Sequence, residues 1–138
     1  MSTTKYLIDT NILIELMHNN HSVEQKMAEV GFNRCNVSIF SLCELYFGAY
    51  RIKNTKYYTN EITKINALRC KLNVIHSIAN AEIFGEIKAH LFDIGKKVDD
   101  MDILIGSLAI ENEMVVVSDN INHFGRMPKV VVENWLER

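Results

Sequence analysis

The sequence predicts an α/β protein, a three-layer α/β/α sandwich around a mostly parallel central sheet of about five strands. Short apolar runs rich in β-branched residues alternate along the chain with longer segments whose apolar residues recur at helical spacing. Strands that alternate with helices form parallel βαβ units in a helix-covered sheet. The chain has 138 residues, 48% of them hydrophobic, which suits a single domain over residues 1–138 with a sizeable core.

Five apolar runs are expected as strands. The first is Lys5–Ile8, and the most β-branched is Met114–Val117. The other three are expected at residues 35–39, 74–75 and 129–132. A polar turn over residues 118–122 separates the last two strands, and both of these strands should be buried.

Helices are expected between the strands, over residues 12–17, 22–30, 41–51, 56–72, 77–94 and 99–110. Ser22 and Ser77 are the expected N-terminal caps of two of them. The spacing of Ser41 and Glu44 matches a capping box, which by itself would account for Glu44.

Charge and hydropathy exclude several classes of protein. Fifteen Lys and Arg residues against seventeen Asp and Glu residues give a net charge of −2, so no overall cationic field indicates binding to DNA or membranes. The longest apolar run, residues 101–110, is interrupted by Asp102 and is shorter than the roughly 20 residues that a membrane span needs. Residues 1–10 lack the pattern of a signal peptide, so we expect a cytoplasmic protein.

The three cysteines do not form a metal-binding pattern. Cys35, Cys43 and Cys70 are odd in number, have no Cys-x-x-Cys spacing and lie in apolar surroundings. We expect reduced thiols in the core. The five histidines show no paired spacing typical of a zinc site, so they are expected as surface or ordinary core residues.

Four acidic residues adjoin apolar segments. Asp9 and Asp119 follow two expected strands, whereas Glu44 and Asp102 lie in the first turns of two expected helices. The carboxyl ends of parallel strands meet at one edge of a sheet, where ligands gather, and crossover connections bring the starts of helices to the same edge. The four acids are therefore expected to share one cleft.

Clustered carboxylates predict a bound divalent metal ion. Like charges in a partly buried cleft repel one another unless a cation neutralises them. Oxygen ligands without paired His or Cys favour Mg²⁺ or Mn²⁺ over zinc. An ion held in this way suits the hydrolysis of phosphoesters, because it activates a water molecule and stabilises charge on the leaving oxygen.

Each acid also has an ordinary structural explanation. Asp9 and Asp119 are common turn and N-cap residues, and the helix dipole favours acids in first turns such as those of Glu44 and Asp102. Taken one at a time, the structural role is at least as well supported as the functional one. The common location of the acids at one sheet edge favours function.

At these residues the chain resembles the PIN-domain nucleases, and among them the VapC-type toxins of bacterial toxin–antitoxin pairs. The likeness spans nearly the whole chain. It lies in four segments, taken in order: YLIDTNILI around Asp9, VSIFSLCELYFGA around Glu44, DILIGSLA from Asp102, and VVVSDNINHF around Asp119. One such segment is weak evidence, but four at the family's spacing are strong evidence.

The resemblance implies an endoribonuclease that depends on Mg²⁺ or Mn²⁺. Asp9, Glu44 and Asp102 match the family's acidic metal-binding and catalytic residues, and Glu44 is our choice for the base that activates water. In the fourth segment Asn120 occupies the family's usual slot and the catalytic candidate Asp119 precedes it. Neighbours in an extended segment point to opposite faces, so without a turn only one of this pair can face the metal.

Supporting roles around the metal fall to four polar residues beside these acids, namely Thr10, Asn11, Ser118 and Asn120. The same resemblance implies three partners: an RNA substrate, a cognate antitoxin protein that covers the acidic cleft, and a second copy of the chain in a homodimer. Lys96 and Lys97 are equally well explained as RNA contacts and as a solvated face.

Two alternatives remain open. A phosphatase of Rossmann-like fold could use Asp9 as its nucleophile, but such enzymes need an Asp-x-Asp pair and this chain has Asp9-Thr10-Asn11. A PIN-like domain that binds RNA without cutting it would be consistent with Asn120 in place of a fourth acid. An asparagine oxygen can still bind a metal or orient water, so Asn120 does not exclude catalysis.

Overall fold

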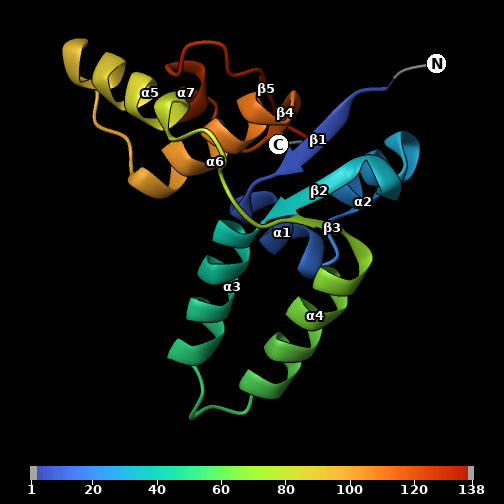
Figure 1. Ribbon diagram of the computed structural model, residues 1–138. Helices are drawn as coiled ribbons and strands as arrows, with labels where there is room; N and C mark the ends of the chain where they lie inside the picture. Colours follow the sequence, from blue (N-terminus) through green and yellow to red (C-terminus); the bar gives the residue numbers. More distant parts are fainter. Residues whose placement is uncertain (1–2, 137–138) are drawn as a thin grey trace.

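The computed structural model describes residues 3–136 and contains one parallel sheet of five strands in the order β3-β2-β1-β4-β5. The strands are β1 (Lys5–Ile8), β2 (Cys35–Ser38), β3 (Asn73–Ile75), β4 (Met114–Val117) and β5 (Val132–Glu133). Figure 1 shows β1 in the middle of the sheet with helices on both faces. The predicted three-layer α/β/α sandwich is confirmed, and its sheet is entirely parallel.

Helices cover both faces of the sheet. The elements are α1 (Thr10–Met17), α2 (His21–Val30), the 3-10 turn η1 (Phe32–Arg34), α3 (Ile39–Arg51), α4 (Tyr58–Lys71), α5 (Ala81–Asp93), α6 (Asp100–Glu111) and α7 (Ile121–Gly125). Helices α1 to α4 pack on one face and α5 to α7 on the other. The hairpin of α3 and α4 extends away from the sheet (Figure 1).

Alternation along the central strands builds two separate cores. Tyr6 and Ile8 of β1 pack into the cluster beneath α1 to α4, whereas Leu7 between them packs into the cluster beneath α5 to α7. Val116 and Val117 of β4 divide between the clusters in the same way. Side chains of a strand point to alternate faces, so both faces of β1 and β4 are apolar and buried.

The end of the chain departs from the prediction. Residues 118–122 were predicted as a polar turn, but residues 121–125 form the short helix α7. The predicted buried strand over residues 129–132 is wrong: β5 has only two residues, and Val131 is 61% exposed. Lys129 has φ of +68°, so the chain turns there instead of entering a strand.

The cysteine prediction is correct for one residue. Cys35 is buried, and this burial raises the pKa of its thiol to about 11, while Arg34 beside it acts in the opposite direction. Cys43 and Cys70 are exposed rather than in the core. All three cysteines are free thiols, so residues 3–136 contain no disulfide. Over the same residues, no helix is long and apolar enough to span a membrane.

Candidate active site

The site lies where the order of strands changes direction. From β1, the chain builds β2 and β3 on one side of the sheet and then β4 and β5 on the other. The space outside the carboxyl ends of β1 and β4, called the crevice below, is the usual ligand site of an open parallel sheet. Asp9 directly follows β1, and its N–H donates to the carbonyl of Val117 at the end of β4 at 2.8 Å.

Asp9 is the most buried acid of the site. Its side chain is 4% exposed and caps the N-terminus of α1, because Oδ1 accepts from the N–H of Thr10 at 2.9 Å. The other oxygen, Oδ2, accepts from the hydroxyl of Ser118 at 2.7 Å. Asp9 therefore serves as an N-cap, as its structural explanation predicts, and also faces the crevice.

Burial raises the pKa of Asp9 from its ordinary value of 3.8 to about 6. The hydrogen bonds from Ser118 and Thr10 favour the charged form and act against this rise, whereas the negative charges of Asp102 and Glu44 add to it. These charges act on Asp9 although Asp102 and Glu44 are 93 and 35 residues away in the sequence. The fold has therefore brought the three acids within electrostatic reach of one another.

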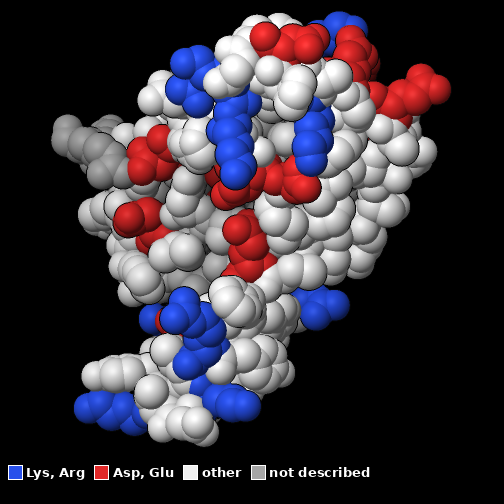
Figure 2. All heavy atoms as spheres, turned by 90° about the vertical axis from the view of Figure 1, so that its left-hand side faces the viewer, with Lys and Arg blue, Asp and Glu red and all other residues white. Residues whose placement is uncertain are grey.

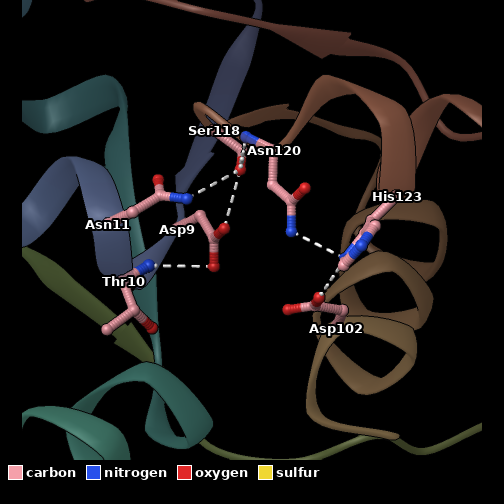
Figure 3. Close-up of polar contacts among 7 residues, drawn as sticks. All are labelled: Asp9, Thr10, Asn11, Asp102, Ser118, Asn120 and His123. Atoms are coloured by element: carbon pink, nitrogen blue, oxygen red, sulfur yellow. Dashed lines mark hydrogen bonds and ion pairs between the residues drawn. The ribbon is translucent and has the colours of Figure 1, made fainter. Parts of the chain in front are cut away.

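Ser118 and Asn11 join the ends of β1 and β4. The buried hydroxyl of Ser118 donates to Asp9 (Figure 3). It accepts from the backbone N–H of Asn120 at 2.9 Å and from Nδ2 of Asn11 at 3.4 Å. Oδ1 of Asn11 accepts from the N–H of Asp119 at 3.2 Å. These bonds fix the orientation of the Asp9 carboxylate, which is the arrangement expected of residues that support a metal ligand.

Glu44 is not part of a capping box. Helix α3 begins at Ile39, and its N-cap is Ser38, whose hydroxyl accepts from the N–H of Ser41 at 3.0 Å. Glu44 lies in the second turn, and its Oε1 accepts from the hydroxyl of Thr10 at 2.7 Å. The structural explanation for Glu44 is therefore wrong, and its carboxylate is directed toward the start of α1.

Asp102 lies on the other side of the crevice, in the first turn of α6. Figure 3 shows the carboxylates of Asp9 and Asp102 pointing toward the space between them. Nδ1 of His123 lies 3.0 Å from Oδ2 of Asp102 and 2.7 Å from Nδ2 of Asn120. A protonated Nδ1 donates to the carboxylate, whereas an unprotonated Nδ1 accepts from the amide, so the tautomer of His123 decides which partner it holds.

Asp119 and Asn120 point in different directions. Oδ1 of Asp119 accepts from Nδ2 of Asn134, beyond the end of β5, at 3.0 Å. The side chain of Asn120 instead reaches His123, beside Asp102 (Figure 3). The structure thus brings Asn120 to the Asp102 side of the crevice and places the Asp119 carboxylate against the final segment of the chain.

The donor set fits a hydrated Mg²⁺ or Mn²⁺ ion. Among residues 3–136, no three His, Cys, Asp or Glu side chains lie close enough together to hold an ion by themselves. Mg²⁺ does not need them, because it keeps several water molecules and is typically bound by one or two carboxylates. The facing carboxylates of Asp9 and Asp102 meet that requirement, and a divalent ion between them would offset the burial and the like charges that raise the pKa of Asp9.

Figure 2 shows how charge is arranged around the site. Acidic side chains gather in the middle of this face, and basic side chains lie above and below them, toward α5 and toward the α3–α4 hairpin. A single strand of nucleic acid could therefore lie with one phosphate at the acids and others on the basic groups.

A parallel α/β sandwich with carboxylates at the end of β1 and on α3 and α6, at its switch point, is an architecture suited to metal-assisted phosphoester chemistry. Residues 6–130 match the PIN domain, which is most of the chain, so the chain belongs to the PIN domain family. The resemblance stated from the sequence is confirmed.

Named relatives share nearly the whole length of the chain. Ribonuclease VapC2 of Haemophilus influenzae is 29% identical over 133 residues, covering 96% of this chain and 98% of the relative. The tRNA(fMet)-specific endonuclease VapC of Salmonella typhimurium is 26% identical over 132 residues, covering 95% and 98%. The crystal structure of VapBC2 from Rickettsia felis bound to a promoter DNA fragment superimposes with a TM-score of 0.85 at 26% identity, covering 96% and 100%.

One residue of the site was not found from the sequence. The spacing of the histidines predicts surface or ordinary core residues, yet His123 contacts both Asp102 and Asn120. His123 follows Asn120, the N-cap of α7, by three residues, so both side chains lie on one side of the helix. This spacing predicts a contact between them only if a helix is expected at these residues.

Proposed function

We propose that this protein is a metal-dependent endoribonuclease that serves as the toxin of a toxin–antitoxin pair. The observation that supports this most directly is the buried Asp9 carboxylate, which faces Asp102 at the switch point and has a pKa raised partly by Asp102 and Glu44. The relatives named as ribonucleases and as a tRNA-specific endonuclease agree with RNA as the substrate. Family resemblance alone would be weaker support, because function resides in the site rather than in the fold.

Asp9 and Asp102 would hold the metal ion, with water completing its coordination. When bound, the ion would polarise the phosphate of the substrate and lower the pKa of a bound water molecule. Glu44, which Thr10 orients by a 2.7 Å hydrogen bond, is proposed as the base that takes the proton from the attacking water. Ser118 holds Asp9, and His123 orients Asp102 on the opposite side of the crevice.

The remaining predicted site residues would act at the edge of this arrangement. Asn120 would orient water or a phosphate oxygen beside Asp102, since its amide already lies there. Asp119 would contribute negative charge at the rim, with its carboxylate held by Asn134. Asn11 would keep the two strand ends together.

Cleavage of RNA by the purified chain tests the proposal. We expect wild-type protein to cut single-stranded or looped RNA, including a transfer RNA, with Mg²⁺ or Mn²⁺ and to stop when EDTA is added. Asp9→Asn and Asp102→Asn should each lower the rate at least 100-fold, and Asp93→Asn, an exposed acid at the end of α5, should leave it unchanged. Equal cleavage by Asp9→Asn would contradict the metal mechanism.

The same preparations separate the two alternatives. Release of phosphate from small phosphomonoesters without cleavage of RNA would identify a phosphatase. Binding of RNA without cleavage at any metal concentration would identify a non-catalytic RNA-binding domain. Neither outcome is expected, because Asp9 and Asp102 face each other and Glu44 bonds to Thr10, as the proposed mechanism requires.

The partners follow from the same proposal. The solved structures to which this chain is similar include DNA-bound VapBC from Rickettsia felis and Salmonella typhimurium, which supports a cognate antitoxin as partner. The antitoxin would cover the cleft, and the chain would act as a homodimer in the cytoplasm. Co-expression with a cognate antitoxin should give a stable complex whose nuclease activity is suppressed. A complex that remains fully active would contradict inhibition at the cleft.

A further inference from the structure

A second hollow lies between the end of α5 and the start of α6. It has a volume of about 390 Å³, and its floor is formed by the buried side chains of Leu91, Val98 and Ile103. Phe92 stands at its edge with 84% of its surface exposed. Phe92 thus offers an exposed aromatic surface beside the apolar floor, a surface suited to stacking against a flat ligand.

Lysines surround this apolar floor. Lys88, Lys96 and Lys97 all line the hollow. Lys88 forms an ion pair with Asp100 at 2.9 Å, whereas within residues 3–136 neither Lys96 nor Lys97 forms a salt bridge. The hollow therefore combines an apolar floor with two lysines that form no salt bridge within the described residues.

A tight turn fixes the positions of these groups. Gly95 has φ of +68°, a backbone conformation that favours glycine, and its N–H donates to the carbonyl of Phe92 at 3.1 Å. The N–H of Lys96 donates to the carbonyl of Leu91 at 2.9 Å. The chain thus folds back over the end of α5, which brings the lysines to the same hollow as the aromatic ring.

The hollow is next to the proposed active site. Ile103 of its floor directly follows Asp102 on α6, and Lys88 of its rim pairs with Asp100 on the same helical turn. Figure 2 shows basic side chains above the acidic centre of this face, on the side of α5. The hollow and the proposed metal ligand Asp102 therefore share the first turn of α6.

Charge decides between the possible occupants. A two-fold contact between two copies of the chain would bring Lys96 and Lys97 of both copies into one interface, where their added positive charge has to be neutralised. A single-stranded nucleic acid offers the opposite charge together with flat bases, and base stacking on aromatic rings beside lysines is how such strands are usually bound.

We propose that the hollow binds an unpaired nucleotide of the RNA substrate that flanks the cleavage site, with its base stacked on Phe92 and its phosphates on Lys96 and Lys97. This proposal rests on the proposed ribonuclease function and specifies how that site holds its substrate. It makes Phe92 a residue for substrate binding rather than for the chemical step.

Binding of RNA in the absence of cleavage tests the stacking contact. In the Asp9→Asn background, a single-stranded RNA with 2-aminopurine at successive positions should show quenching at one position. We expect Phe92→Ala to abolish this quenching and weaken binding about tenfold. Phe92→Trp should keep both, and Ile94→Ala, an apolar residue that is 45% exposed and outside the hollow, should match the parent.

The dependence on salt tests the lysines. Lys96→Gln combined with Lys97→Gln should lower the slope of log Kd against log salt by about 1 to 2, because each phosphate contact releases counterions. Lys5→Gln, an exposed residue at the start of β1 and so at the opposite end of that strand from Asp9, should leave the slope unchanged. With Asp9 intact, Phe92→Ala should raise KM for RNA and change kcat little.

Several results would overturn the proposal. If wild-type protein cuts RNA but Phe92→Ala and the lysine variants bind and cut equally well, the nucleotide site is wrong and the ribonuclease function stands. If Phe92→Ala instead changes the oligomeric state in sedimentation while a monomeric form still binds RNA normally, the hollow contacts a second copy. If wild-type protein neither binds nor cuts RNA, the proposed function itself fails.

Discussion

The carboxylate of Asp9 accepts hydrogen bonds from the Thr10 amide and the Ser118 hydroxyl, yet its burial raises the pKa to about 6. The folded state therefore binds a proton at this site more tightly than the unfolded state does. Stability from this group is fully present below pH 3.8 and is lost as the pH rises to about 6. Above that pH the charged carboxylate costs about 3 kcal/mol of folding free energy.

Asp9→Asn removes this cost, so without metal the variant should be more stable than wild type at pH 7.5 by about 1 to 3 kcal/mol. The advantage should nearly disappear at pH 4, where the wild-type carboxyl is protonated in the folded state. Urea denaturation at the two pH values in EDTA measures it. A variant that gains nothing between pH 4 and pH 7.5 would show that Asp9 is not a destabilising charge; Asp93→Asn is the exposed control.

His123 is predicted to orient Asp102 for metal binding. Removing a residue that holds a metal ligand typically weakens metal affinity 10- to 100-fold, so His123→Ala should bind Mn²⁺ that much more weakly in calorimetry and cut RNA correspondingly slowly at low metal. His123→Gln can still donate to the carboxylate and should restore part of the affinity. His21→Ala is the matched control, since the His21 side chain is fully exposed on α2. Unchanged Mn²⁺ affinity in His123→Ala would contradict the assignment.

At the scale of the helix, the cap residues differ from those that the sequence suggested. Ser22 and Ser77 were expected as N-caps, but Asn20 caps α2 and Asn80 caps α5. In each case an asparagine lies within three residues of the serine and is an equally good cap. Local sequence therefore located the start of each helix only to within a turn, and packing selected the residue that caps it.

The cap of α5 can be tested with a matched pair of exposed residues. Oδ1 of Asn80 accepts from the N–H of Glu82 at 3.1 Å, so Asn80→Ala should lower the free energy of unfolding by about 1 kcal/mol. Ser77→Ala, three residues earlier and outside the helix, should change it by less than about 0.5 kcal/mol. Thermal or urea denaturation of the two variants gives the comparison. A larger effect for Ser77→Ala would mean that the helix begins where the sequence indicated.

The last strand shows a second limit at the same scale. Residues 130–132 are three valines, yet only Val132 and Glu133 pair with β4. The positive φ of Lys129 and the exposure of Val131 show that the chain reaches the sheet later than its composition suggests. An edge strand pairs with a neighbour on one side only. The turn at Lys129 therefore sets where β5 begins, and the β-propensity of the valines does not extend it.

For the whole molecule, metal binding and folding should be linked through pH. An ion that binds only the folded state stabilises it by mass action, so millimolar Mn²⁺ should raise the Tm of wild-type protein at pH 7.5. The rise should shrink at pH 5, because the Asp9 carboxyl, with a pKa of about 6, is then mostly protonated and the ion must displace that proton.

Differential scanning fluorimetry at both pH values measures this linkage. Asp9→Asn and Asp102→Asn should lose the shift at pH 7.5, and Asp93→Asn should keep it. A shift of equal size in Asp9→Asn, or one that grows toward pH 5, would show that Mn²⁺ binds elsewhere.

The sequence by itself determined the α/β class, the parallel sheet and the position of Asp9 at the end of β1, because alternating apolar runs and helical periodicity are local signals. It also singled out Glu44 and Asp102 as acids beside apolar segments. The tertiary structure alone decided that Glu44 bonds to Thr10, that Asn120 rather than Asp119 turns toward Asp102, and that His123 joins them. These contacts connect residues from different elements, and their geometry depends on how the helices pack on the sheet, which no local pattern records.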